Sequence, residues 1–133
     1  MQIKDRTWLE KIKYNQDGLI PVITQDEETG RILMLAWMNE KTLEKTGDEE
    51  IVTYWSRSRK KNWTKGEESG HIQTLVSVQL DCDGDALLLK VKQSGGIACH
   101  TGRNSCFYSE LDKSGWKTVE LVLKNPKEIY GNG

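Results

Sequence analysis

Short apolar runs separated by polar turns make up the first third of the chain. Apolar residues at helical spacing predict a short helix over Trp8–Tyr14. Ile20–Thr24 and Ile32–Trp37 are apolar runs that flank the polar segment Asp26–Gly30, an arrangement typical of two strands joined by a turn. We therefore predict a β-hairpin in this part of the chain.

The next segment carries the signals of a helix followed by a strand. The side chain of Asn39 can accept a hydrogen bond from a first helical turn, and Gly47 is of the residue type that ends helices. We predict a helix over Glu40–Thr46, between these two residues. Ile51–Trp55 predicts a short strand, and Ser56–Gly70, which is polar and basic, predicts a loop.

The second half of the chain predicts three more strands. Ile72–Leu80 and Ala86–Val91 are apolar runs joined through Asp83-Gly84, a dipeptide that favours a hairpin turn. A last strand is predicted over Val119–Leu123. The balance of elements favours an α+β domain, predominantly antiparallel β-sheet with a few short helices.

Length, charge and hydropathy limit the classes of protein to which the chain can belong. At 133 residues the chain is expected to form one domain, residues 1–133, with a core that needs no disulfides. A net charge of −1 argues against a strongly basic nucleic-acid binder. The mean hydropathy is −0.65, and no apolar stretch approaches the roughly 18 residues of a transmembrane helix. Met1–Arg6 is charged and precedes no apolar run, so we expect no secretory signal and a cytoplasmic location.

The three cysteines of the chain are Cys82, Cys99 and Cys106. In a reducing cytoplasm, cysteines are more often ligands or catalytic groups than disulfide partners. Their spacing differs from the paired C-x-x-C of a structural zinc finger, but three thiolates would leave a fourth zinc position for water or for His100. The alternative is that they are three small buried residues.

Three aspartates surround the first cysteine at alternate positions. On a strand, Asp81, Asp83 and Asp85 would share one face and Cys82 would point to the other, whereas a turn at Asp83 would crowd the carboxylates at its tip. Like charges this close repel, and an all-oxygen site suits magnesium. The alternative is a solvated acidic turn that holds no metal.

A cluster of aromatic, hydroxyl and cationic residues covers Tyr54–Gly66. Arg57 and Arg59 could hold a phosphate through their forked donors, and a tryptophan could stack on a base. His71 follows closely and is a candidate general base. Taken alone, these features are more typical of an exposed basic loop, a core tryptophan and a structural histidine.

The order of these motifs resembles that of the phosphoribosyl-AMP cyclohydrolases of histidine biosynthesis, over about residues 18–108. Each motif alone is weak, but their order and co-occurrence are specific. The matching stretches are Leu35–Asn39, Tyr54–Arg59 with Trp63, Lys65 and Gly66, Ser69–His71, Asp81–Asp85 and Ala98–Phe107.

The resemblance implies two metals and a homodimer. The implied ligands are thiolates for zinc and carboxylates for magnesium: Cys82, Cys99 and Cys106 for the first, and Asp81, Asp83 and Asp85 for the second. The implied homodimer is intertwined, with Cys82 serving a zinc site that is completed by the partner's Cys99 and Cys106. The alternation argument, which points Cys82 away from its own aspartates, agrees with such a shared site.

Two further features bear on the resemblance. The segment Gln93–Ile97 is one residue longer than the usual family spacing. The chain ends at Gly133, too soon for the fused pyrophosphohydrolase domain of many relatives, so we expect the single-activity form.

The resemblance also implies a reaction. Water would add to C6 of the adenine ring, which a substituent on N1 makes electron-poor, and loss of N1 would open the ring and leave a carboxamide. Zinc can lower the pKa of bound water from about 15.7 to about 7 for such an attack. The zinc deaminase pattern, H-x-E followed by P-C-x-x-C, is absent, so we expect no loss of ammonia.

The implied roles of the site residues divide into proton transfer and substrate binding. We favour His71 as the general acid or base and His100 as a neighbour that orients Cys99. The substrate contacts are expected from one aromatic, two hydroxyl and four cationic side chains: Trp55, Ser56, Ser58, Arg57, Arg59, Lys65 and Arg103.

Two other functions are alternatives to the hypothesis that the chain is an enzyme of this family. A zinc-stabilised nucleic-acid-binding module would use the Trp- and Arg-rich cluster, but the near-zero net charge and the acidic triplet argue against it. A thiol redox protein would need a C-x-x-C pair, which the chain lacks. We therefore expect a small-molecule nucleotide partner, no nucleic acid and no membrane.

Overall fold

The structure, a computed structural model, describes residues 5–129. A short 3-10 helix, η1 (Thr7–Lys11), opens this part of the chain and buries Leu9. It is shorter than the helix predicted over Trp8–Tyr14, because the backbone of Ile12 is extended (φ −78°, ψ 128°). The next N–H group, that of Lys13, donates a 2.8 Å hydrogen bond to a turn carbonyl far along the chain instead of continuing the helix.

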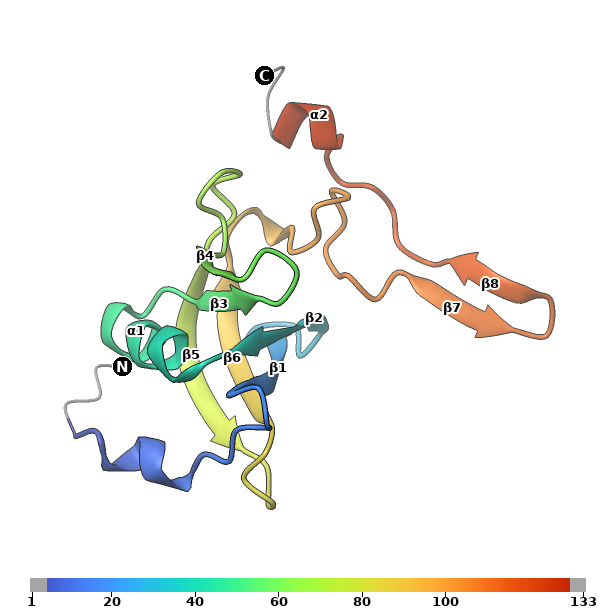
Figure 1. The fold of residues 1–133 in the computed structure, drawn as a ribbon. Helices are drawn as coiled ribbons and strands as arrows, with labels where there is room; N and C mark the ends of the chain where they lie inside the picture. Colours follow the sequence, from blue (N-terminus) through green and yellow to red (C-terminus); the bar gives the residue numbers. More distant parts are fainter. Residues whose placement is uncertain (1–4, 130–133) are drawn as a thin grey trace.

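Four strands form the central sheet, in the order β2-β1-β6-β5 (Figure 1). Their bounds are β1 (Ile20–Asp26), β2 (Ile32–Met38), β5 (Gln73–Leu80) and β6 (Leu87–Gln93). Both predicted hairpins form, since β1–β2 and β5–β6 are antiparallel neighbours. The prediction of an α+β fold with mainly antiparallel sheet is therefore confirmed.

The central pair of the sheet, β1 and β6, is parallel, which the sequence did not predict. The ends of β1 and β6 therefore meet at the same edge of the sheet, together with the start of β2. The segment with Cys99 and Cys106 follows β6 at this edge, while the aspartate turn precedes β6 at the opposite edge. This topology separates the two groups of candidate metal ligands.

One face of the sheet carries the core and the other is open. Four almost fully buried side chains share one core cluster with Leu43 of helix α1 and Tyr54 of strand β3: Ile20, Val22, Leu87 and Leu89. On the outer face, Ile23 pairs with Leu35 across β1 and β2, and these side chains remain 36% and 49% exposed. The outer face is therefore an apolar surface that no described residue covers.

Helix α1 (Glu40–Glu49) begins where the sequence predicts. The side chain of Asn39 accepts from the N–H of Thr42, and the hydroxyl of Thr42 accepts from the N–H of Asn39, so a full capping box starts the helix. The predicted end at Gly47 is wrong. Gly47 is buried inside the helix, and Glu50 instead adopts the left-handed conformation that ends it (φ 62°).

Strands β3 (Thr53–Ser56) and β4 (Lys61–Thr64) form a separate two-stranded sheet. The strand predicted over Ile51–Trp55 is shifted slightly, and the loop predicted over Ser56–Gly70 is wrong where β4 lies. Tyr54 and Trp63 pair across this ladder with ring centroids 5.0 Å apart. Such a cross-strand aromatic pair stabilises a ribbon whose β4 sequence is too polar to indicate a strand by itself.

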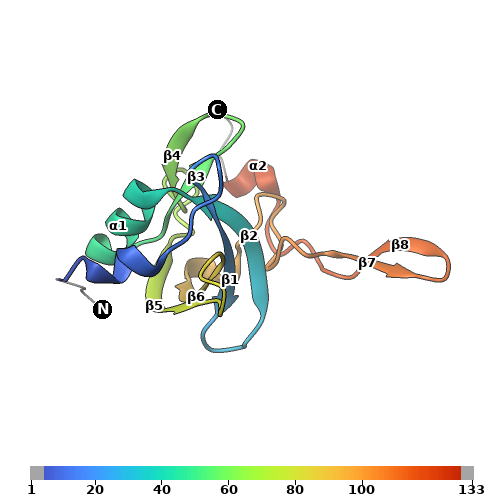
Figure 2. The ribbon, with the colours of Figure 1, turned by 60° about the horizontal axis from the view of Figure 1, so that its bottom comes forward.

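After β6, the segment noted in the sequence contains the 3-10 turn η2 (Ser94–Gly96). The chain then enters a projecting arm made of β7 (Ser109–Asp112) and β8 (Gly115–Thr118), which pair only with each other (Figure 2). The strand predicted over Val119–Leu123 is wrong: this segment is irregular and its apolar side chains are exposed. Its backbone bonds to the described chain only at separate points, with the N–H of Val119 donating to Tyr108 and that of Leu123 to Gly102, so no ladder forms. Helix α2 (Pro126–Ile129) follows.

The sequence analysis expects neither a membrane-spanning helix nor a secretory signal. Within residues 5–129, no helix has the length and apolar character needed to cross a membrane. The expectation that Met1–Arg6 is not a secretory signal falls mostly outside the described residues.

Candidate active site

A cavity of about 590 Å³ opens beside β4 and the cysteine segment. Its volume lies within the range of substrate and cofactor sites, about 300–1,000 Å³. The structure thus brings the cationic cluster and the cysteine segment, which are far apart in the sequence, to one place. Five residues predicted for the site line this cavity: Ser56, Arg59, Lys65, His100 and Cys106.

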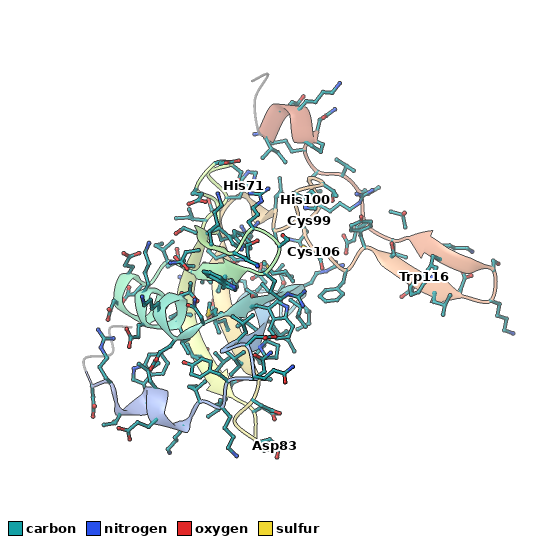
Figure 3. The ribbon with its side chains drawn as sticks, in the orientation of Figure 1. His71, Asp83, Cys99, His100, Cys106 and Trp116 are labelled. Carbon is teal, nitrogen blue, oxygen red and sulfur yellow. The ribbon has the colours of Figure 1, made fainter. Side chains whose placement is uncertain are left out.

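Two of the three predicted zinc ligands, Cys99 and Cys106, lie together, and Cys106 lines this cavity (Figure 3). Cys99 is buried, whereas Cys106 keeps exposed surface. Desolvation raises the pKa of the Cys106 thiol to about 12, and the charge and hydrogen bond of Cys99 add to this shift. The positive charge of Lys65 acts in the opposite direction and lowers the same pKa. Thr101 donates a 3.0 Å hydrogen bond from Oγ1 to Sγ of Cys99. Two adjacent thiols, one held by a hydroxyl donor, fit zinc as a donor set.

Backbone hydrogen bonds fix the loop that carries these cysteines. The N–H of Cys99 donates to the carbonyl of Arg103 over 3.1 Å. The N–H of Cys106 donates to the carbonyl of Leu33, near the start of β2, over 2.7 Å. The hydroxyl of Ser105 bonds to the same Leu33 carbonyl over 3.3 Å. The loop is therefore anchored to the edge of the central sheet at which β6 ends.

Cys82, the third predicted zinc ligand, lies at the opposite edge of the sheet. It belongs to the turn of Asp83, which Figure 3 shows far from Cys99 and Cys106. Strand β6, with its seven residues, separates this turn from the cysteine segment by about 20 Å at the rise of a β-strand. Because a zinc–sulfur bond is only about 2.3 Å long, the three cysteines of one chain cannot bind the same zinc ion.

The turn that carries the aspartates is compact and exposed. Ligand atoms of Asp81, Cys82 and Asp83 lie within 4.8 Å of one another, and Asp85 is outside this group. The argument that points Cys82 away from its aspartates is wrong, because residues 81–85 form a turn and not a strand. The carboxylate oxygens fit magnesium in kind, and Cys82 places a soft ligand beside them.

Lys65 is the buried cation of the cavity, only 8% exposed. Desolvation lowers the pKa of its ammonium group, and the nearby Cys106 and Cys99 oppose this shift. Its Nζ lies 5.9 Å from the ring centroid of Trp63. No carboxylate in the described part of the chain forms an ion pair with it. A buried ammonium group without an acidic partner is suited to an anionic ligand.

The two histidines lie near the cysteines but differ in their relation to the cavity (Figure 3). His100 lines the cavity, whereas His71 does not. The ring of His71 lies against Gly95, where an added Cβ would stand 2.9 Å from Cδ2 of the imidazole. The pKa of His71 is lowered, first by desolvation and then by the charges of Lys124 and Lys65. His71 is therefore mostly neutral at pH 7 and can accept a proton.

A second cavity, of about 480 Å³, borders the first. Three predicted substrate contacts line it without lining the first cavity: Trp55, Arg57 and Ser58. The guanidinium carbon of Arg57 lies 4.6 Å from the ring centroid of Trp37, which also lines this cavity. The predicted contacts of the β3–β4 turn are thus divided between two cavities.

Arg103 lines neither cavity. Its guanidinium carbon lies 4.2 Å from the ring centroid of Tyr108. Its Nε donates a 3.2 Å hydrogen bond to the carbonyl of Glu120. The structure therefore places this predicted phosphate contact against the segments that flank the arm, and not with Arg57 and Arg59.

Some cavity residues are not among the site residues predicted from the sequence. Trp63 lines both cavities, and Met34, Glu67 and Glu68 line the first. Trp63 stands inside the mixed cluster, but no local pattern distinguishes a base-stacking tryptophan from a core one. The acidic pair after Gly66 gives no pattern beyond a polar loop, so only the tertiary structure could find it.

Fold and site together define a small α+β protein whose thiol- and cation-lined cavity lies at one edge of its sheet. A family model described as phosphoribosyl-AMP cyclohydrolase matches residues 34–108. The chain is 59% identical over 128 residues to a phosphoribosyl-AMP cyclohydrolase of Pseudomonas syringae pv. syringae (strain B728a), covering 96% of this chain and 98% of that protein. It is also similar to a phosphoribosyl-AMP cyclohydrolase of Pseudomonas aeruginosa (strain LESB58), with 58% identity over 94% of this chain and 93% of that protein. A phosphoribosyl-AMP cyclohydrolase of Chromobacterium violaceum is 54% identical over 93% of this chain and 94% of that protein. The chain belongs to the phosphoribosyl-AMP cyclohydrolase family, a family of enzymes.

The matched segment coincides with the site. Residues 34–108 include every residue predicted for catalysis, metal binding or substrate binding. Helix η1 and the β7–β8 arm lie outside this segment. The arm is thus an addition to the part of the chain that the family model describes.

Proposed function

We propose that this protein hydrolyses phosphoribosyl-AMP and opens its adenine ring between N1 and C6, as a step of histidine biosynthesis. The observation that carries the proposal is the 590 Å³ cavity, in which the thiol of Cys106 lies with His100 and the cations Lys65 and Arg59. Such a cavity combines donors for a hydrolytic metal with positive charge for a phosphate-bearing substrate. Membership of the family supports the same substrate.

The proposed reaction adds one water and loses no ammonia. The oxygen of water bonds to C6, the bond between C6 and N1 breaks, and the exocyclic nitrogen stays on the product as a carboxamide. N1 departs with the proton that balances the addition. Zinc, when bound, supplies the hydrolytic chemistry, because it lowers the pKa of water to about 7.

The chain's own residues transfer the proton and hold the substrate. His71, neutral because its pKa is lowered, accepts a proton from water and returns one to N1. His100, which lines the cavity beside the thiols, orients Cys99. We expect His71→Asn to lower kcat by about 10²–10⁴-fold with zinc content unchanged, and His100→Asn to lower zinc content. Equal kcat in wild type and His71→Asn would remove His71 from the mechanism.

We further infer that zinc binds between two copies of the chain. Cys82 is about 20 Å from the other two cysteines, at the far edge of the sheet. An intertwined homodimer with two-fold symmetry would bring Cys82 of one subunit to Cys99 and Cys106 of the other and would form two equal sites. Magnesium would bind through the carboxylates of the turn that also carries Cys82: Asp81, Asp83 and Asp85.

Exposed apolar surface supports such a dimer. On the outer face of the sheet, Ile23 and Leu35 are 36% and 49% exposed, and on the arm Leu111 and Trp116 are 62% and 71% exposed. Exposed apolar patches mark interaction sites when they are large. A second copy of the chain that covers it would form the homodimer, and a reducing cytoplasm would keep the three cysteines available as ligands.

The reaction is tested by incubating the purified protein with phosphoribosyl-AMP and measuring product mass and free ammonia, with and without zinc chelation. The expected product has gained one water, with no ammonia released, and chelation abolishes its formation. Release of ammonia would show a deaminase instead. No reaction from folded protein that carries zinc would contradict the proposed function.

The shared zinc site is tested by subunit complementation. Cys82→Ser and Cys99→Ser are each expected to be inactive alone. When the two are co-expressed, half of the randomly assembled dimers contain one intact site, so activity returns to roughly a quarter of the wild-type value. Co-expressed Cys99→Ser and Cys106→Ser form no intact site and serve as the matched control. Absence of recovery in the first pair would rule out a site shared in this way.

A further inference from the structure

The two cavities at the β3–β4 turn share only two lining residues, Ser56 and Trp63. Arg59 belongs to the first cavity and Arg57 to the second. Neither arginine forms an ion pair with a carboxylate of residues 5–129. Each cavity therefore offers one forked cation without an anionic partner in the described chain, which is the donor that phosphate groups prefer.

Trp63 lines both cavities and is fixed in place by a neighbouring ring. It pairs with Tyr54 across the ladder, at a centroid distance of 5.0 Å and an interplanar angle of 34°. Tyr54 is fully buried and cannot yield space behind the indole. A partly exposed tryptophan held in this way is a platform on which a planar base can stack.

The turn places the two arginines in different cavities. The hydroxyl of Ser56 accepts a 3.2 Å hydrogen bond from the N–H of Arg59 and lies 3.4 Å from the hydroxyl of Ser58. The guanidinium carbon of Arg57 stands 4.6 Å from the ring centroid of Trp37. Ser56 thus braces the turn at the border of the cavities, and each arginine is positioned before any ligand binds.

We propose that the substrate lies across Trp63, with its purine on the indole and one of its two phosphates in each cavity. This inference rests on the proposed function, because phosphoribosyl-AMP carries one phosphoribosyl group on N1 and another on N9 of a single purine. The first cavity holds Cys106 and His100, so it receives the C6–N1 edge that reacts. Its cations, Arg59 and Lys65, bind the phosphate of the N1 substituent.

The second cavity receives the other half of the substrate. Arg57 and the hydroxyl of Ser58 bind the 5′-phosphate of the adenosine half, which points away from the reacting edge. The second cavity contains no cysteine or histidine, so it positions the substrate and takes no part in the bond changes. Arg57 and Arg59, two residues apart, therefore have separate ligands.

Adenosine 5′-monophosphate tests this division, since it contains the purine and only the phosphate assigned to the second cavity. We expect Arg57→Gln to weaken its binding by about tenfold or more in calorimetry, because a charge-assisted contact is lost. Arg59→Gln is expected to change this affinity by no more than about twofold. Lys61→Gln, an exposed cation on β4 that lines neither cavity, is the matched control.

The platform is tested with two further variants. Trp63→Leu should weaken adenosine 5′-monophosphate binding by roughly tenfold, while Trp63→Phe should keep most of the affinity because a stacking face remains. Circular dichroism of both variants separates loss of stacking from loss of fold. Equal affinity in Trp63→Leu and wild type would overturn the role of the indole.

The remaining outcomes distinguish this inference from the proposed function. If Arg59→Gln weakens adenosine 5′-monophosphate binding as much as Arg57→Gln, or if Arg57→Gln has no effect, the division into two cavities is wrong. Absence of binding to the wild-type protein would overturn it as well. The proposed function is tested by a separate measurement. If zinc-loaded wild-type protein does not turn over phosphoribosyl-AMP, the proposed function is wrong, regardless of how the variants bind adenosine 5′-monophosphate.

Discussion

The hydroxyl of Tyr54 donates a 2.6 Å hydrogen bond to the side-chain oxygen of Gln73 inside the core. Thr24 contacts the same hydroxyl at 2.7 Å. The side-chain nitrogen of Gln73 continues the network to Gln93 over 2.9 Å, and that of Gln93 donates to the backbone carbonyl of His71 over 2.9 Å. The core of the protein is thereby tied to the segment that carries a candidate catalytic histidine.

This network predicts a loss of stability in Tyr54→Phe. Removing the hydroxyl leaves buried polar groups of Gln73 and Thr24 with one partner fewer, so the free energy of unfolding should fall by about 1–3 kcal/mol in urea titration. Tyr108→Phe is the matched control, because the hydroxyl of Tyr108 makes no hydrogen bond among the described residues. Equal unfolding free energies for the two variants would contradict the importance of the network.

Two adjacent glycines allow the packing of His71 to be tested. Gly95 and Gly96 both have positive φ, 71° and 66°, so alanine at either position should cost about 1–2 kcal/mol of stability. Only at Gly95 would the new Cβ meet the imidazole, at 2.9 Å from Cδ2, while Gly96 faces open space. We expect Gly95→Ala to shift the His71 imidazole signals in NMR and to lower kcat, and Gly96→Ala to do neither. Identical spectra for both variants would show that the contact is unimportant.

The lowered pKa of His71 predicts a response to pH. Its folded-state pKa lies below the usual 6.5, so the unfolded chain binds more protons and the contribution of His71 to stability is lost as pH falls from about 6.5. Removing the positive charge in Lys124→Ala should raise the pKa in an NMR titration, part of the way toward 6.5, because desolvation remains the larger cause. Lys127→Ala removes an exposed cation that does not contribute to the shift of this pKa, and it should leave the pKa unchanged. A titration of His71 above 6.5 in the wild type would refute the shift.

The exposed arm predicts the behaviour of the proposed dimer. Leu111 and Trp116 pair across β7 and β8 and are 62% and 71% exposed. The double change Leu111→Asp and Trp116→Ser should shift the protein from dimer toward monomer in sedimentation equilibrium and lower its zinc content, with little change in circular dichroism. Lys113→Ala, in the turn of the arm, is the control. A variant that stays dimeric would exclude the arm from the interface.

Local patterns predicted most elements of the central sheet and the start of its main helix. The two hairpins follow from alternating apolar runs around short polar turns, and the capping box of Asn39 follows from one side chain near its own backbone. Strand β4 and the arm escaped prediction because their stability comes from cross-strand partners and not from an apolar pattern. The segment 119–123 shows the reverse case, in which an apolar pattern exists but isolated backbone hydrogen bonds to Tyr108 and Gly102 take the place of a strand ladder.

By itself, the sequence determined which chemistry the protein can carry, because thiols, carboxylates, imidazoles and guanidinium groups keep their reactivity wherever the fold places them. Tertiary structure alone decided how these groups combine. The hydrogen bond of Cys106 to Leu33 holds its loop at the edge where β6 ends, opposite the turn of Cys82, and the β3–β4 ribbon places Arg57 and Arg59 in different cavities. Such arrangements depend on packing between segments that are distant in the chain. The free energy of this packing cannot be predicted from a local sequence pattern.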